Sequence, residues 1–185
     1  MPLKSKILVI TKQGSVKKSN INNQKAAKMR RQRGYHWEDT IVKRFNGTPK
    51  WRAFRLGSPS IALPDVLAVN NENEELFTIE AKSGTSTSLP VPADQIERCL
   101  DWIETFGVYK KRNVLLAFKF LSKKRLGIGK YENRELREFF KIWDPSLEIT
   151  DCVCTYDGKV FAKNDGEKKE LFLKECLMPF KTKQR

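Results

Sequence analysis

Residues 64–69 and 76–82 are two short apolar runs on either side of the polar segment 71–74. Each run is rich in residues that favour strands, and the second alternates in polarity toward its end. A link of about four residues joins antiparallel neighbours, because a parallel pair needs a crossover of a dozen residues or more. The sequence therefore predicts a β-hairpin and a fold built on a sheet.

The register of this hairpin brings three charged residues to one end. With the turn centred between Glu72 and Asn73, cross-strand partners have numbers that sum to 145, so Asp65 faces Glu80. Directly opposed side chains lie about 4.5–5.5 Å apart at Cβ. Lys82 lies on the same face as Glu80, because side chains alternate along a strand. We expect two carboxylates and an ammonium group to converge there.

These three residues have the composition of a phosphodiester-cleaving site. Opposed carboxylates destabilise a strand pair unless a divalent cation lies between them, and their oxygens suit Mg²⁺, with Mn²⁺ as a substitute. A bound cation lowers the pKa of its water, and Lys82 can stabilise charge on a phosphate. The alternative is a surface ion pair between Glu80 and Lys82 beside a solvated Asp65.

An acid also interrupts an apolar helix face upstream. Residues 34–45 predict a helix that ends at Asn46-Gly47. The apolar residues at helical spacing on its buried face are Ile41, Val42 and Phe45. Glu38 lies among them, and a buried carboxylate needs partners. The alternative is a partly exposed Glu38 paired with a nearby base such as Arg33.

The charge balance predicts a polyanionic partner. The chain has 36 Lys plus Arg against 22 Asp plus Glu, a net charge of +14, which indicates nucleic acid first and an anionic membrane second. Residues 1–33 carry ten basic residues and no acid, so we expect a flexible arm that binds phosphates, with 20–33 helical when bound. An unstructured solubilising tail is the alternative. The residues expected to line a DNA surface include Arg30, Arg31, Arg33 and Arg55.

No apolar run approaches the ~20 residues that span a bilayer, so we expect an intracellular, nucleoid-associated protein without a membrane partner. The four cysteines are expected to be reduced, partly buried thiols. Further elements are predicted as a strand at 51–58, a helix at 93–106, a buried strand at 113–120, a basic loop at 123–130, a short helix at 134–143, a hairpin at 152–156 and 159–162, and an amphipathic helix with a basic tail at 166–185.

These motifs together resemble the PD-(D/E)xK nucleases, and within them the archaeal Holliday-junction resolvases. The matching stretches are Gly34-Tyr35-His36-Trp37-Glu38, Arg55-Leu56-Gly57-Ser58, Pro64-Asp65, Ile79-Glu80-Ala81-Lys82 and the helix that contains Gln95. The resemblance covers roughly residues 33–145. It implies an α/β, restriction-endonuclease-like fold, with a mixed central sheet flanked by helices, in a nuclease domain at 34–165.

The resemblance also implies the chemistry and the partners. Glu38, Asp65 and Glu80 take the metal-site roles, Lys82 is the catalytic cation, and Ser58, with Ser60 as a rival, lies near the scissile phosphate. Gln95 is expected to hydrogen-bond near the site and to contact DNA, with a position on the helix surface as the alternative. A homodimer would make paired nicks across a four-way DNA junction, and a recombination or replication-clamp protein is a further expected partner.

Two other functions stay open. A different nuclease of this fold, for repair or restriction, would cut linear, flapped or damaged DNA in preference to junctions. A non-catalytic DNA-binding protein would show salt-sensitive binding without metal-dependent strand scission, and the complete set of acids and lysine argues against it.

Overall fold

The computed structural model describes residues 13–56, 62–164 and 167–182. The chain divides into two compact units, Met1–Gln32 and Arg33–Arg185. The described part of the first unit is helical and forms the beginning of α1 (Gln13–Asn46). The prediction that this helix starts at residue 34 is wrong. Residues 22–33 are mostly polar and basic but include good helix formers such as Ala, Lys, Gln and Met, so helix propensity is present without an apolar stripe to reveal it.

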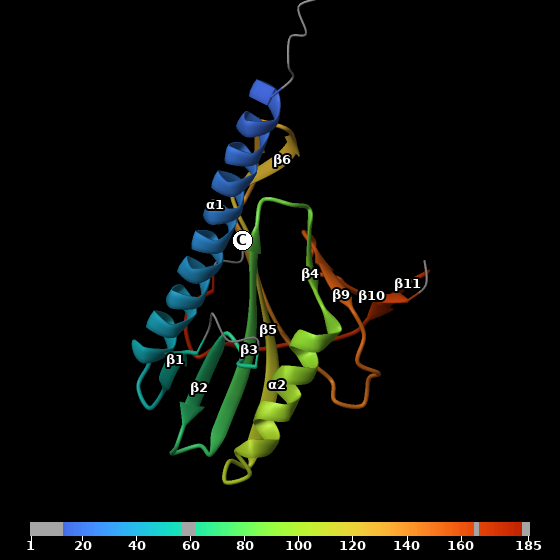
Figure 1. Ribbon diagram of the computed structural model, residues 1–185. Helices are drawn as coiled ribbons and strands as arrows, with labels where there is room; N and C mark the ends of the chain where they lie inside the picture. Colours follow the sequence, from blue (N-terminus) through green and yellow to red (C-terminus); the bar gives the residue numbers. More distant parts are fainter. Residues whose placement is uncertain (1–12, 57–61, 165–166, 183–185) are drawn as a thin grey trace, which may run out of the picture. The chain divides into compact units, whose positions relative to one another are not determined.

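The second unit is built on a six-stranded mixed sheet in the order β1-β2-β3-β5-β8-β12 (Figure 1). β3 and β5 are parallel, and the other neighbours are antiparallel. The strands are β1 (Arg52–Arg55), β2 (Val66–Asn70), β3 (Glu75–Gly84), β5 (Lys111–Phe120), β8 (Arg137–Ile142) and β12 (Lys174–Glu175). The predicted α/β class with a mixed central sheet is confirmed.

A smaller four-stranded sheet and one separate hairpin complete the strands. The smaller sheet has the order β11-β10-β9-β4, and β6 pairs with β7 alone. Their bounds are β4 (Ser88–Val91), β6 (Lys123–Gly127), β7 (Lys130–Asn133), β9 (Cys152–Thr155), β10 (Val160–Asn164) and β11 (Glu167–Leu171). The predicted hairpin around Asp157-Gly158 is confirmed, because β9 and β10 pair across it. Gly158 has a φ of +84°, which favours glycine in that turn.

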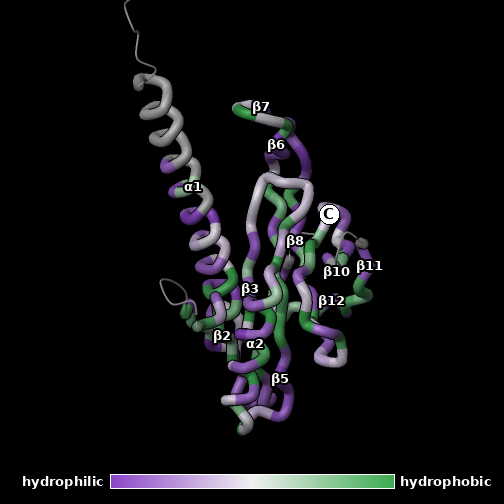
Figure 2. Tube along the Cα trace, turned by 45° about the vertical axis from the view of Figure 1, so that its right-hand side comes forward, coloured by the Kyte–Doolittle hydropathy of each residue, from purple (hydrophilic) through white to green (hydrophobic). Residues whose placement is uncertain are grey.

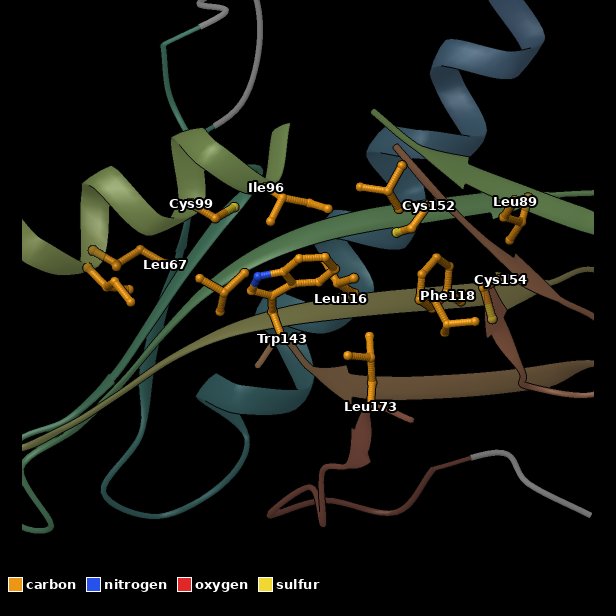
Figure 3. Packing of buried hydrophobic residues seen from close by; sticks show 14 of the residues in the cluster. Leu67, Leu89, Ile96, Cys99, Leu116, Phe118, Trp143, Cys152, Cys154 and Leu173 are labelled. Atoms are coloured by element: carbon orange, nitrogen blue, oxygen red, sulfur yellow. The ribbon is translucent and has the colours of Figure 1, made fainter. Parts of the chain in front are cut away.

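Apolar side chains fill both faces of the six-stranded sheet. On one face the part of α1 from Arg33 onward packs against β2, β3, β5 and β8 through Trp37, Ile41 and Phe45. On the other face α2 (Ala93–Thr105) and the smaller sheet pack through Ile96, Cys99, Cys152 and Cys154 (Figure 3). The tube coloured by hydropathy shows hydrophobic segments concentrated in β5 and its neighbours (Figure 2). The central strands are therefore buried on both sides.

The predicted hairpin register is confirmed. Val66 pairs with Ile79 and Leu67 with Thr78, so partner numbers sum to 145. β3 also pairs in parallel with β5, which makes the strand that carries Glu80 and Lys82 central. A central strand with partners on both sides is a rigid support for functional side chains.

The C-terminal third differs most from the sequence prediction. The expected helix at 134–143 is wrong, because β8 forms there between β5 and β12. The expected loop at 123–130 is instead part of the β6–β7 hairpin. The expected helix at 166–185 is also wrong: β11 and β12 form in it, and Leu173 is buried in the core. In each case pairing with distant strands overrides local helix or loop propensity.

Candidate active site

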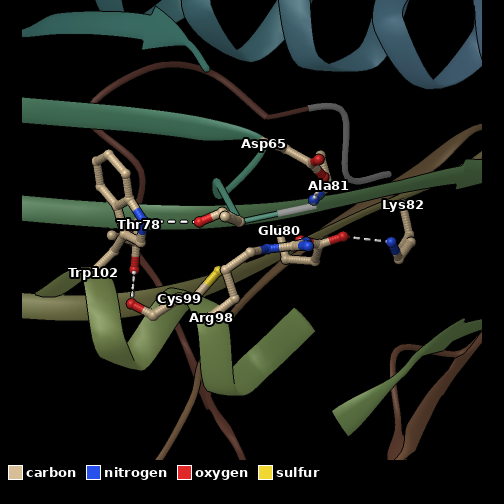
Figure 4. A network of polar contacts seen from close by, with 9 residues as sticks. Asp65, Thr78, Glu80, Ala81, Lys82, Arg98, Cys99 and Trp102 are labelled. Carbon is tan, nitrogen blue, oxygen red and sulfur yellow. Dashed lines mark hydrogen bonds and ion pairs between the residues drawn. The ribbon is translucent and has the colours of Figure 1, made fainter. Parts of the chain in front are cut away.

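Glu80 is a buried carboxylate held by two cations. It lies on β3, and only 1% of the residue is exposed. Its Oε1 accepts a hydrogen bond from Nζ of Lys82 at 2.5 Å, and its Oε2 accepts one from Nη2 of Arg98 at 3.0 Å (Figure 4). A buried charge requires such partners, so these contacts account for the presence of Glu80 inside the fold.

Asp65 immediately precedes β2, and the hairpin register continued by one residue beyond the Val66–Ile79 pair places it level with Glu80. Its Oδ2 accepts a hydrogen bond from the backbone N–H of Ala81 at 2.8 Å, which ties the carboxylate to β3 (Figure 4). The short turn and the register bring Asp65 to the Glu-x-Lys motif, as predicted from the sequence. The side chain is partly exposed, so it is open to a ligand from solvent.

Glu38 approaches the same place from the opposite face of the sheet. It belongs to α1, which covers the face opposite to α2, and it is 6% exposed. The predicted burial of this acid on an apolar helix face is confirmed. Asp65, directly before β2, lies within electrostatic range of Glu38 and of Glu80.

The three acids perturb one another. Burial raises the pKa of Glu38 to about 7, Asp65 and Glu80 add to the rise, and Arg55 opposes it. Burial likewise raises the pKa of Glu80 to about 7, with Lys82 and Arg98 opposing the rise and Asp65 adding to it. Two carboxyl groups with raised pKa values beside a third carboxylate form an electrostatically unfavourable cluster, of the kind found at functional sites.

The donor set fits a hard divalent cation in its chemistry. Carboxylate oxygens are the ligands that Mg²⁺ prefers, and a cation would relieve the repulsion among the three acids. Among the described residues, no three of His, Cys, Asp and Glu lie close enough together to form a ligand group. Both oxygens of Glu80 are also engaged by Lys82 and Arg98. The assignment of Glu38, Asp65 and Glu80 as metal ligands therefore stays a proposal.

Comparison with known proteins identifies the family. Residues 29–153 match the family model described as archaeal Holliday junction resolvase. The chain belongs to this family. A solved structure similar to this one is that of Archaeoglobus fulgidus Hjc, a Holliday junction resolvase from an archaeal hyperthermophile. It is 20% identical, covers 57% of this chain and 70% of that chain, and has a TM-score of 0.40. Comparison with curated proteins gives no match.

Membership in the resolvase family confirms the resemblance drawn from the acids and the lysine, and it implies a nuclease that acts on DNA. The matched range contains Glu38, Asp65, Glu80 and Lys82. It extends to residue 153, beyond the predicted limit of 145. No helix in the described part of the resolvase chain has the length and apolar character to cross a bilayer.

The remaining predicted residues have different outcomes. Arg55 ends β1 exposed, 3.5 Å from Asp39 and 5.0 Å from the centre of the Tyr35 ring. Ser58 and its rival Ser60 lie outside the described residues. Gln95 is on α2, and its buried Oε1 has no hydrogen-bond partner among the described residues.

The predicted arginines of α1 lie on both sides of the unit boundary. Arg31 belongs to the first unit and is exposed, whereas Arg33 opens the second unit and is partly buried. Arg30 lies in the helix, and its side chain is outside the described residues.

Sequence reasoning missed Arg98, which contacts Glu80 directly. Arg98 follows Gln95 by three residues on α2, and residues three apart share a helix face. The expectation that Gln95 lies near the site could therefore have been extended by one turn to Arg98. What the sequence lacked was the packing of α2 against β3, which makes that face the one that meets Glu80.

Proposed function

We propose that this resolvase-family chain is a metal-dependent endonuclease that resolves four-way DNA junctions during recombination and repair. Acting as a homodimer with two active sites, it hydrolyses one phosphodiester bond in each of two opposing strands. The observation that carries the proposal is the meeting of Asp65 with Glu80 and Lys82 at one end of the β2–β3 hairpin. The family match supports the junction as substrate.

Each residue of the site has its own role in this reaction. Glu38, Asp65 and Glu80 would hold Mg²⁺, or Mn²⁺ in its place. The metal when bound supplies Lewis-acid charge and a water of lowered pKa. Lys82 places a positive charge beside Glu80, where it can stabilise negative charge on the phosphate. Without metal the pKa of Glu38 is about 7, so binding of a cation near neutral pH would displace a proton from this carboxyl group.

The basic surface would bind the DNA backbone. Arg31 and Arg55 are exposed, and the net charge of +14 favours a polyanion. We propose that the basic residues 1–33 add non-specific phosphate contacts and Arg55 adds one beside the site. These contacts position the junction without reading its sequence.

A cleavage assay on matched substrates tests the proposal. An end-labelled four-way junction and a linear duplex made from one of its arms would be incubated with the purified protein in Mg²⁺ or in EDTA. We expect symmetric nicks near the branch point, lost in EDTA, with linear duplex largely spared. Equal cleavage of linear DNA would indicate a nuclease of another type. Tight binding without cleavage of either substrate in Mg²⁺ would indicate a non-catalytic DNA-binding protein.

A further inference from the structure

The β6–β7 hairpin makes no contribution to the core. Every residue in the described range 123–133 is exposed or partly exposed. Two exposed apolar residues lie at its turn: Leu126 is 58% exposed and Ile128 is 95% exposed. Figure 2 shows the hairpin beyond the end of the six-stranded sheet, with hydrophobic segments at its outer end and a hydrophilic segment nearer the sheet. An isolated two-stranded hairpin is marginally stable in water, and exposed apolar side chains that cluster often mark a binding site. The apolar tip of this hairpin therefore requires an explanation.

The strands below the tip are basic. The hairpin has four basic residues and one acidic residue: Lys123, Lys124, Arg125, Lys130 and Glu132. Lys124 faces Glu132 across the strands, with an ion pair of 3.5 Å. Arg125 faces Tyr131, which is half exposed. A basic row beside an exposed aromatic ring fits a nucleic acid, since phosphates and base faces are its two recognisable surfaces.

The base of the hairpin is fixed to the strand that carries the active site. The backbone N–H groups of Leu121 and Arg125 donate to the carbonyls of Gly84 and Thr85, at 2.9 and 3.0 Å. The Arg134 side chain donates to the carbonyls of Leu121 at 2.8 Å and Ser86 at 2.9 Å. β3 leads directly from Lys82 to this anchored base, so the hairpin has a defined position relative to the catalytic strand.

The reach of the hairpin matches a DNA substrate bound at the site. Thr85 is three residues beyond Lys82 and bonds to Arg125 of β6, and Ile128 at the tip is three residues beyond Arg125. Six residues span about 20 Å at ~3.3 Å per residue. That length corresponds to about six base-pair steps at ~3.4 Å each. One DNA molecule can therefore contact Lys82 and the hairpin at once.

We propose that the β6–β7 hairpin is a DNA wedge that recognises the branch point. Its basic residues hold phosphates, and its tip, Leu126 and Ile128, enters between bases where stacking is already broken. Apolar wedges of this kind insert between base steps at the expense of stacking. The free-energy cost of unstacking bases is smallest at a branch, so the wedge favours branched over linear DNA. This inference rests on the proposed function and adds the element that selects the substrate.

The test is a double substitution at the tip, Leu126→Ser with Ile128→Ser. Both side chains are exposed, so the fold is expected to survive. Val108→Ser is the matched control, because Val108 is an apolar residue that is 81% exposed. It precedes the first residue of β5, whereas the hairpin follows the last residue of that strand. Binding to a four-way junction and to linear duplex would be measured by fluorescence anisotropy in EDTA. In parallel, 2-aminopurine at the branch point would report unstacking on binding.

We expect the tip variant to bind the junction about tenfold more weakly, as for the removal of one side chain that stacks on a base. Its binding to linear duplex should change little, and the increase in 2-aminopurine emission that we expect with wild type should disappear. The Val108→Ser variant should match wild type in all three readouts. Because these readouts need no cleavage, a failure of the wedge is distinguishable from a failure of nuclease activity.

Three results would overturn the wedge. One is unchanged junction affinity and emission in the tip variant. Another is an equal loss of affinity for junction and linear DNA. The third is an altered oligomeric state in sedimentation with DNA binding intact, which would make the hairpin a protein-contact surface.

Discussion

Arg98 on α2 donates to Oε2 of Glu80 on β3 at 3.0 Å, whereas Lys82 donates to the other carboxylate oxygen, Oε1. The Arg98–Glu80 pair connects the helix that covers one face of the sheet to the strand that carries the active site. Arg98 lowers the electrostatic cost of a nearly inaccessible carboxylate and fixes its direction. It is a positioning residue, because it acts on the reaction through Glu80.

Replacement of Arg98 is expected to slow cleavage. Arg98→Gln should lower kcat by about 10- to 100-fold, the usual effect of removing a group that orients a ligand residue, with little change in KM for the junction. Arg98→Lys should recover part of the activity. Arg112→Gln is the control, because Arg112 lies on β5, donates to the carbonyl of Ile103 and lies near Glu104, with no contact to the acids of the site. A purely structural role would instead lower the melting temperature and leave kcat of the folded fraction unchanged.

Metal-free stability should decrease as pH rises. Glu38 has an ordinary pKa of 4.5, and in the folded protein its pKa is about 7. Folding therefore favours its protonated form, so its contribution is fully present below about pH 4.5 and is lost as pH rises through 7. Glu38→Gln mimics the neutral form. Without metal, the variant should match wild type near pH 5 and exceed it near pH 8 by on the order of 1–2 kcal/mol, about 2–8 °C in Tm.

Thermal melts in EDTA at the two pH values measure this difference. Mg²⁺ at pH 8 should raise the Tm of wild type more than that of Glu38→Gln, because the cation stabilises the charged acids. Equal Tm values for the two proteins at both pH values would mean that folding does not raise the pKa of Glu38.

Removal of residues 1–30 should weaken DNA binding and leave the fold intact. These residues carry eight basic side chains, including Arg30, and no acid, and the unit that holds the sheet begins at Arg33. The slope of log K against log salt should flatten by ~0.9 for each phosphate that the truncated protein no longer neutralises. Titrations at several salt concentrations, with circular dichroism as a check on folding, measure this slope. A truncated protein with the wild-type slope would exclude the arm from DNA binding.

The sequence was sufficient for the centre of the site because local features determine it. A short polar turn fixes the register between Asp65 and Glu80, and strand alternation places Lys82 beside Glu80. Helical periodicity places Glu38 on the buried face of α1. Each inference needs only residues close in sequence and one regular element.

Features that depend on distant contacts were not predictable in the same way. β8 contains Glu138, a buried acid that would be unfavourable on an isolated strand, but Arg44 of α1 binds it in a two-bond pair. Nothing local indicates that Arg44 and Glu138 meet, so the segment resembled a charged helix. Arg98 was missed for the same reason, since its role depends on where α2 packs.

The most direct test of the site is single-turnover cleavage of a four-way junction by Asp65→Asn beside wild type, with junction affinity measured on the same preparations. Asparagine can still accept the hydrogen bond from Ala81, so the fold should be kept. We expect cleavage to fall by about 10³-fold or more while affinity is unchanged or tighter, because a negative charge that faces phosphate is removed. Wild-type cleavage by the folded variant would contradict the assignment of Asp65, Glu80 and Lys82 as the active site.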